Sequence, residues 1–298
     1  MRRRSFVALT AAILFATAAV RPHTRANITG FAGSFVWVNP DPGFGGLSAV
    51  EMSPDGSRIT ALSDRGRLIA GQVDRAADGS IAAITTESLR ALPRPAADGG
   101  ADATFDTEGL AIAPDGTMFL SGETPARILR YDPDGRDPAV LTAPGEFGAM
   151  RANKSLESLA IDSGGALYTL PEETFRPDGA FPVYRYRNGV WDQPFLVAGK
   201  GTFLPVGADF GPEGQLYILE RQFRGLGGFA SRVRRSTGIM GGLAQDEVLI
   251  ETPPGQFGNL EGISVWRDSQ GALRLTLVSD DNFLSFLETE VAEFRVPD

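Results

Sequence analysis

Short hydrophobic segments end in turns rich in Pro, Asp and Gly at intervals along the chain. Residues 46–56 (GLSAVEMSPDG) and 109–116 (GLAIAPDG) are the clearest examples, and related segments return at 158–165, 207–214 and 262–271. Asp and Gly accept the backbone angles of tight hairpin turns, so each unit predicts a strand that leads into a hairpin. A second strand is expected after each turn. Outside the N-terminal region, no segment of about a dozen residues shows convincing helical periodicity.

Repetition of this unit predicts an all-β fold, a β-propeller of four-stranded blades. The last unit is one strand short, whereas residues 31–38 form a spare strand at the start of the chain. Pairing of this first strand with the last sheet would close the ring and leave no open sheet edge. The repeat count favours five blades. Six blades, or a β-sandwich with coincidental turns, are the alternatives.

The first residues are typical of an export signal. Three arginines at positions 2–4 precede an apolar run to Val20, which is too short to cross a bilayer. The sequence RRSFV at 3–7 resembles a twin-arginine signal, with an ordinary secretory signal or an uncleaved anchor as alternatives. We therefore expect an export signal over residues 1–26, a single propeller domain over 27–298, and a periplasmic or secreted protein.

Composition removes several kinds of chemistry. The chain has no cysteine and a single histidine, His23, near the N-terminus. Disulfides and cysteine nucleophiles are excluded, and a Ser-His-Asp triad or a His-ligated zinc site is hard to build. The formal net charge is −9 at pH 7, and loss of the basic signal makes the mature chain more acidic. We expect no nucleic-acid partner, no stable membrane insertion and a monomer.

Acidic residues recur at equivalent positions of the repeated units. In a propeller, the start of each blade's first strand and the end of its second strand lie at the same mouth of the central channel. Glu108, Glu157 and Glu261 stand at first-strand starts, and Asp209 lies slightly further in. The ends of second strands carry further acids, which are Asp64, Glu123, Glu172, Glu173, Glu220, Asp280 and Asp281.

Carboxylates crowded at one mouth repel one another, and several resist ionisation unless a cation compensates. Ca²⁺ suits a site made only of oxygen ligands, so we expect Glu108, Glu157 and Glu261 to hold calcium. The alternative is that these acids pair with neighbouring cations or are solvated at a rim. No organic cofactor is expected.

Three cations are predicted at the same mouth. Lys154 comes three residues before Glu157, while Arg65 and Arg221 follow second-strand acids. Such cations would hold an anionic substrate, for example a phosphate ester. Charge balance for Glu157 is the alternative role of Lys154.

Six stretches of the chain resemble the phytase-like family of exported bacterial propellers, which is described by an esterase-like activity. They are LSDRG at 62–66, TEGLA at 107–111, NKSLESLA at 153–160, LERQF at 219–223, NLEGI at 259–263 and VSDDNF at 278–283. The resemblance implies hydrolysis of phosphate or other esters. It extends to the calcium-dependent propeller phytases, whose six blades differ from the five expected here.

These observations predict a metal-dependent phosphoesterase or related ester hydrolase that acts on a small anionic ester. Calcium bound by the three glutamates would polarise the ester and bind water, and Asp209 or Glu220 would serve as general base. Two alternatives remain, because a fold does not fix a function. One is a non-enzymatic propeller that binds a ligand or a protein at the mouth, and the other is a lactonase-type propeller hydrolase.

Overall fold

A computed structural model describes residues 25, 28–95, 106–151, 154–173 and 176–297. The export signal expected at the N-terminus lies, except for Arg25, outside the described residues. No helix within these ranges is long and apolar enough to span a bilayer.

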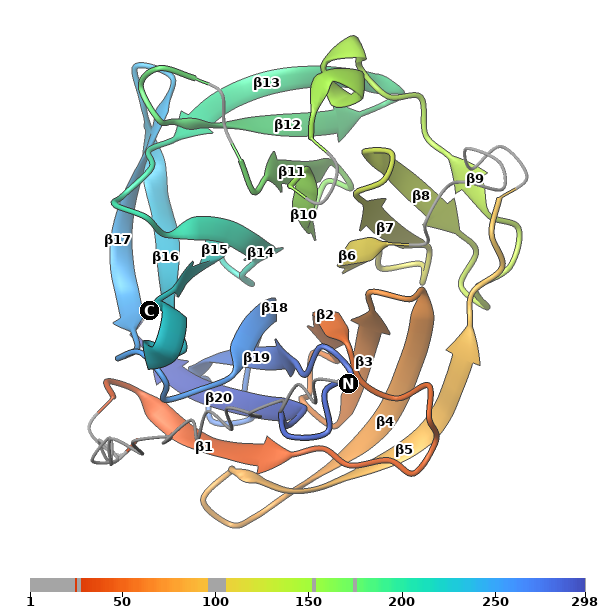
Figure 1. Cartoon of the computed structure of the whole chain (residues 1–298), viewed down its shortest axis with the longest axis vertical. Helices are drawn as coiled ribbons and strands as arrows, with labels where there is room; N and C mark the ends of the chain where they lie inside the picture. Colours follow the sequence, from red (N-terminus) through yellow and green to blue (C-terminus); the bar gives the residue numbers. More distant parts are fainter. Residues whose placement is uncertain (1–24, 26–27, 96–105, 152–153, 174–175, 298) are drawn as a thin grey trace, which may run out of the picture.

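Antiparallel sheets surround a central axis, and the chain runs from one to the next around the ring (Figure 1). Four sets of consecutive strands follow one another from the first hairpin. They are β2 (Leu47–Met52), β3 (Arg58–Ser63), β4 (Arg67–Arg75) and β5 (Ile81–Ala91); β6 (Thr107–Ile112), β7 (Met118–Gly122), β8 (Arg127–Tyr131) and β9 (Ala139–Val140); β10 (Leu156–Ile161), β11 (Leu167–Pro171), β12 (Phe181–Arg187) and β13 (Val190–Val197); and β14 (Leu204–Phe210), β15 (Leu216–Phe223), β16 (Phe229–Met240) and β17 (Leu243–Glu251).

The first and the last described strands belong to one sheet. Its strand order is β1-β20-β19-β18, with β1 (Phe31–Val36), β18 (Asn259–Arg267), β19 (Leu273–Asp280) and β20 (Glu290–Val296). The first strand pairs antiparallel with the last, with Phe35 opposite Val291. The prediction of an all-β propeller with four-stranded sheets, closed by pairing of its terminal strands, is therefore confirmed.

The sets β10–β13 and β14–β17 merge into one eight-stranded sheet. Their outer strands β13 and β17 meet through a parallel pairing of Leu196 with Leu243. The backbone N–H of Leu196 also donates to the carbonyl of Gly242, at 2.8 Å. These two neighbouring sets are thus joined at their outer edges as well as through their packed faces.

Hydrophobic cores lie between neighbouring sheets. Within the described residues, five clusters each combine side chains of two adjacent strand sets. The cluster between the first and last sets, for example, contains Leu47, Ile69, Trp266 and Val291. Strand β18 is buried along nearly its whole length, whereas β5 alternates between half-buried and exposed residues. Inner strands are covered on both faces, so most of their side chains are buried, the polar ones included.

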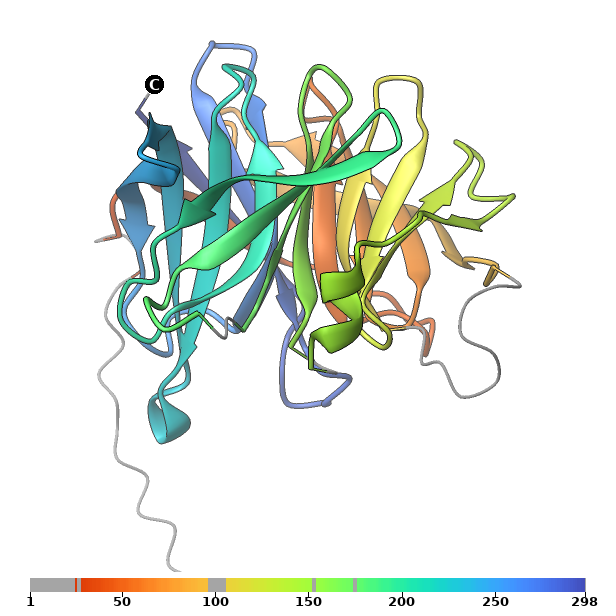
Figure 2. The ribbon, with the colours of Figure 1, turned by 90° about the horizontal axis from the view of Figure 1, so that it is seen from above.

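The hairpins that join inner and second strands lie at one end of the barrel-shaped ring, and longer loops leave the other end (Figure 2). These longer loops include the 3-10 helix η4 (Gly225–Gly227) after β15 and the connection from β19 to β20. At the hairpin end, Gly56 has φ 68° and Gly271 has φ 82°, a region that favours glycine. A side chain at Gly56 would overlap the ring of Trp266, whereas Gly271 has open space around it.

This difference gives a matched pair of variants. Gly56→Ala adds backbone strain and a clash with buried Trp266, and we expect it to lower the free energy of unfolding by about 2–4 kcal/mol. Gly271→Ala adds only the strain, and the expected loss is about 1 kcal/mol. Urea unfolding followed by tryptophan fluorescence measures both. Equal losses in the two variants would show that the Trp266 contact does not constrain this turn.

Candidate functional site

A narrow cavity lies on the propeller axis and is lined by residues of the inner strands β2, β6, β10, β14 and β18. Glu108, Glu157 and Glu261 all line it. The side chains of Glu157 and Glu261 are buried, and Glu108 is half-buried. The cavity measures about 10 Å³, which is close to the room of one water-sized sphere. The structure thus brings together the three glutamates that the repeats single out.

Irregular pairing places these glutamates on the axis. The register between the first and second strands shifts once across each glutamate. The shifts fall between Thr107 and Leu110, between Leu156 and Ser158, and between Leu260 and Gly262. Such β-bulges add a residue to one strand and redirect its side chain. Each shift falls at the first-strand position where an acid recurs, so a local distortion of the sheet turns the carboxylates inward.

Glycines let the inner strands approach closely at this level. A Cβ at Gly109 would lie 2.7 Å from the Cβ of Leu159, and one at Gly262 would lie 2.8 Å from the Cα of Ala49. Both distances are shorter than real side chains tolerate. The Glu-Gly pairs of the sequence therefore combine an inward carboxylate with a backbone position that keeps the channel narrow.

More acids surround the axial three. Asp106, Glu108 and Glu123 present carboxylate oxygens that all lie within 4.8 Å of one another. Asp64 and Asp280 also act on this group, because their charges contribute to the pKa shifts of Glu108 and Glu261, respectively. Asp106 was not singled out from the sequence. A signal was present, since Asp106 and Glu108 are two residues apart and lie on the same face of an extended strand.

Burial makes these acids reluctant to ionise. Desolvation raises the pKa of Asp64 to about 7, with repulsion from Asp280 as the next cause. Desolvation likewise raises the pKa of Glu261 to about 8, although the charge of Arg221 opposes the shift. The pKa values of Glu108 and Glu157 lie well above the ordinary range, first through burial and then through neighbouring carboxylates.

Arg221 is the cation at the centre of the cluster. Its Nη1 donates to Asn259 Oδ1 at 2.8 Å and also to Glu261 Oε1, while Nη2 donates to Glu172 Oε1 at 3.2 Å. Burial lowers the pKa of this guanidinium, but Glu261, Glu157 and Glu172 together outweigh burial and raise it. Arg221 therefore stays charged and offsets part of the negative charge.

Lys154 and Arg65 occupy the rim. Lys154 Nζ lies 3.8 Å from Glu172 Oε2, and the lysine side chain is about one-third exposed. The guanidinium of Arg65 stacks on the ring of Phe283, 3.4 Å from its centroid, and its charge lowers the pKa of Asp64. Lys154 and Arg221 thus contact acids of the mouth, and Arg65 acts on one of them, Asp64, through its charge.

The two carboxylates assigned as general base do not join this group. Both oxygens of Asp209 accept backbone N–H groups, from Phe210 at 2.7 Å and from Val265 at 2.6 Å. Burial raises the pKa of Asp209 to about 7. The charge of Asp209 in turn raises the pKa of Glu51. Asp209 stands three positions after Val206, the residue at the bulge of β14, so it lies deeper along the channel.

Glu220 is fully buried between two arginines. Arg232 Nη2 lies 2.6 Å from Glu220 Oε2, and Arg234 Nη2 lies 2.7 Å from Glu220 Oε1. Arg234 also contacts Asp246 at 3.0 Å, so Glu220, the two arginines and Asp246 form a buried network of four charged groups within the β14–β17 set. A carboxylate held in this way stabilises the sheet and is not placed to take a proton at the mouth.

The donor set of the mouth fits a hard cation. Its ligands are all carboxylate oxygens, which Ca²⁺ and Mg²⁺ prefer. Asp64 Oδ1 is buried and, among the described residues, has no hydrogen-bond partner. An unsatisfied buried acceptor beside several high-pKa acids costs free energy that a water ligand of a bound dication would recover by donating a hydrogen bond to it. The acidic group Asp106, Glu108 and Glu123 is therefore a candidate metal site.

Several solved structures are similar to this chain at low sequence identity. A calcium-binding protein, regucalcin, from Agrobacterium tumefaciens is 12% identical, with a TM-score of 0.50 over 90% of this chain and 95% of that chain. Virginiamycin B lyase from Staphylococcus aureus is 16% identical, with a TM-score of 0.42 over 89% and 74% of the two chains. A gluconolactonase from Xanthomonas campestris is 13% identical, with a TM-score of 0.44 over 84% and 72%.

A family assignment comes from the sequence itself. No curated protein matches this chain. The family described as "Phytase-like: Esterase-like activity of phytase" matches residues 42–283, which include every acid of the mouth described above. The chain therefore belongs to the phytase-like family.

Proposed function

We propose that this protein is a metal-dependent hydrolase of small anionic esters, and that phosphate monoesters are its substrate class. The observation that carries the proposal is the convergence of buried, high-pKa carboxylates around one guanidinium at a single mouth. Strongly perturbed titratable groups gather at functional sites more often than elsewhere. Family membership adds the expectation of ester hydrolysis.

Asp106, Glu108 and Glu123 would hold the metal, with Glu157 and Glu261 on its axial side. We propose Ca²⁺, because the ligands are all oxygens and the group is rich in carboxylates. When bound, such a dication lowers the pKa of a water ligand and polarises a phosphoryl or carbonyl oxygen.

The side chains of the mouth supply the rest of the chemistry. Arg221, Lys154 and Arg65 neutralise the anionic group of the substrate and orient it. In the reaction, water adds across the ester bond, and the products are an alcohol and phosphate. Asp64 replaces Asp209 and Glu220 as the acceptor for the proton of this water, since its Oδ1 has no hydrogen-bond partner among the described residues.

We also make proposals about the number of blades, the location and the oligomeric state. We infer a ring of five blades, since the described strands fall into five consecutive sets of four and five clusters lie between them. We also propose that the protein is exported to the periplasm or beyond the cell and acts as a monomer.

Hydrolysis is tested with metal-free protein to which Ca²⁺ is then added. We expect phosphate release from aryl and alkyl phosphates only in the presence of Ca²⁺. Lactones and carboxylic esters belong in the same panel, because they separate a phosphoesterase from other ester hydrolases. Equal rates in the presence of a chelator, or no turnover of any ester in the panel, would refute the proposal.

Glu108→Gln removes a charge that both the metal triad and the axial cavity share. We expect kcat/KM to fall at least about 100-fold and Ca²⁺ affinity to fall at least about tenfold. Glu213→Gln is the matched control, because Glu213 lies in a hairpin turn at the opposite end of the ring and pairs with Arg267. Calorimetric Ca²⁺ titration and initial rates measure both effects. Unchanged binding in Glu108→Gln would remove this residue from the metal site.

Stability should depend on pH in a direction set by the raised pKa values. Asp64 and Glu261 have pKa values of about 7 and 8 in the folded protein, above those of unfolded carboxyls near 4. The folded state binds more protons between these limits, so metal-free protein loses stability as pH rises from about 4 to 8.

Calcium should reverse this loss. We expect Ca²⁺ to raise the melting temperature at pH 8 by about 5 °C or more, and by less at pH 5, where protons compete for the same oxygens. Differential scanning calorimetry with and without chelator provides the measurement. A larger calcium effect at pH 5 than at pH 8 would contradict the site.

A further inference from the structure

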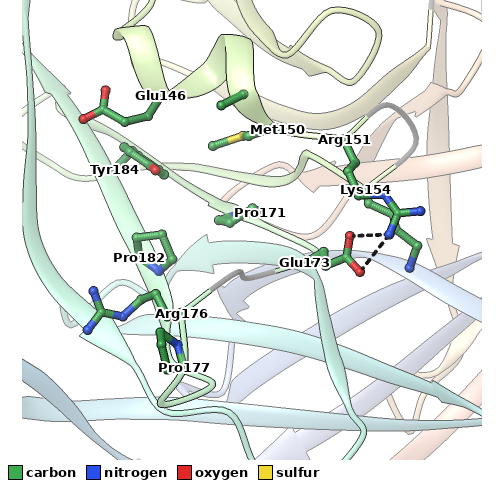
Figure 3. Close-up of a pocket in the computed structure, with 11 residues that line it drawn as sticks. Glu146, Met150, Arg151, Lys154, Pro171, Glu173, Arg176, Pro177, Pro182 and Tyr184 are labelled. Carbon is green, nitrogen blue, oxygen red and sulfur yellow. Dashed lines mark hydrogen bonds and ion pairs between the residues drawn. The ribbon is translucent and has the colours of Figure 1, made fainter.

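A second hollow opens beside the acidic mouth on the β10–β13 set. It has a volume of about 420 Å³ and lies between the 3-10 helix η3 (Gly145–Ala149) and the strands β11 and β12. Carbon atoms dominate its wall. Figure 3 shows Met150, Pro171, Pro182 and Tyr184 around this space. We call it the Tyr184 pocket, defined by Ala149, Met150, Lys154, Pro171, Pro182 and Tyr184.

Charged groups stand at the edge of the Tyr184 pocket. Its lining includes the cations Arg151, Lys154 and Arg176 and the carboxylates Glu146 and Glu173. Arg151 Nη1 lies 3.2 Å from Glu173 Oε2, and the arginine side chain is 61% exposed (Figure 3). Exposed ion pairs contribute little to stability, so an anionic ligand is able to compete for Arg151. An apolar interior with a cationic edge suits a molecule that carries one anionic group on an apolar body.

Lys154 connects this pocket to the acidic mouth. It lines the pocket, and its Nζ lies 3.8 Å from Glu172 Oε2. The other oxygen of Glu172 accepts a hydrogen bond from Arg221, which in turn donates to Glu261 on the axial cavity. Pro171, in the pocket wall, directly precedes Glu172 in the chain. A substrate whose anionic group lies at Lys154 and Arg221 would therefore direct its remaining atoms toward the pocket.

We propose that the Tyr184 pocket binds the alcohol part of the ester, and that this alcohol is an aryl or compact apolar group. The proposal rests on the proposed ester hydrolase function and names its substrate class. An aromatic ring gains free energy when it leaves water for such a wall, whereas a polyhydroxylated alcohol would lose hydrogen bonds to water that carbon atoms do not replace. The volume is at the small end of the range for ligand pockets, which suits one or two fused rings.

The kinetic test compares 1-naphthyl phosphate with methyl phosphate in the presence of Ca²⁺. In the unmodified protein we expect kcat/KM to be at least about tenfold higher for 1-naphthyl phosphate. Ala149→Trp fills the pocket and should lower this ratio at least about tenfold, chiefly through KM for the aryl ester. Thr237→Trp is the control. It adds the same side chain to a separate cavity of about 350 Å³ lined by Tyr168, Phe195 and Phe210, and the ratio should not change.

A binding measurement tests the pocket even if no substrate is hydrolysed. The probe is 8-anilino-1-naphthalenesulfonate, an aromatic anion that is not an ester, and its fluorescence reports binding to chelator-treated protein. We expect 1-naphthyl phosphate to displace it more strongly than inorganic phosphate does, and Ala149→Trp, but not Thr237→Trp, to weaken it at least about fivefold. If Ala149→Trp does not fold, Arg151→Gln changes only an exposed side chain and should weaken the probe about threefold.

The outcomes separate the two proposals. If Ala149→Trp weakens probe binding, Thr237→Trp does not, and no ester is hydrolysed, the hydrolase function is overturned and the pocket is supported as a binding site. Calcium-dependent turnover with the same aryl preference in Ala149→Trp as in the unmodified protein would overturn the pocket and leave the hydrolase. A preference for methyl phosphate in the unmodified protein would also overturn the pocket.

Discussion

Electrostatic repulsion among carboxylates on the propeller axis is the constraint on which the site depends. Closing the ring brings Glu108, Glu157 and Glu261 to one narrow cavity that leaves little room for water. Ionised together, they would repel one another in a region where solvent screens poorly. Arg221 offsets part of this repulsion, and raised pKa values remove more of it through protonation. Gathering these carboxylates lowers the stability of the centre of the protein. The negative charge that they carry depends on how many of them are protonated.

The rest of the ring compensates for this cost. Hydrophobic clusters fill the interfaces between neighbouring sheets, and the pairing of β1 with β20 leaves the last sheet with its full set of strands. Buried ion networks add geometric constraints away from the mouth, as Glu220 does between Arg232 and Arg234. Glu220, which pairs with two arginines, and Asp64, whose Oδ1 has no hydrogen-bond partner among the described residues, thus differ in what their carboxylates are able to do. The first fixes a sheet, and the second is available to a ligand.

The architecture could be predicted because its signals are local and repeated. Strand-turn segments such as 46–56 and 109–116 specify hairpins, and their repetition specifies sheets around an axis. The positions of Glu108, Glu157 and Glu261 followed from their equivalence within this repeat. By contrast, Asp209 is displaced along its strand, and its Oδ2 accepts the backbone N–H of Val265 in β18, a contact that depends on the packing of neighbouring sheets.

Contacts between distant segments decided the remaining cases. Glu220 was expected at the end of a second strand, but β15 continues to Phe223, and the partners of Glu220 come from β16, whose arginines were not recognised as buried. The pairing of β13 with β17 left no sequence signal, since it depends on how far two outer strands extend. The Tyr184 pocket is formed by a 3-10 helix and by proline-containing segments without repeat counterparts, so no periodic pattern pointed to it.

The pairing of β1 with β20 also determines how the ring responds when the position of the chain ends is changed. Because the first and last described strands lie in one sheet, their order along the chain represents only one possible opening of a circular arrangement of strands. A circular permutant, with the old ends joined and new ends placed in an outer connection, would retain the same neighbours around the axis. Deleting β1 is not equivalent, because it exposes the edge of β20, and the unpaired backbone groups of that edge can pair with another chain. The closure of the ring around the acidic mouth therefore depends on β1, the edge strand of the last sheet.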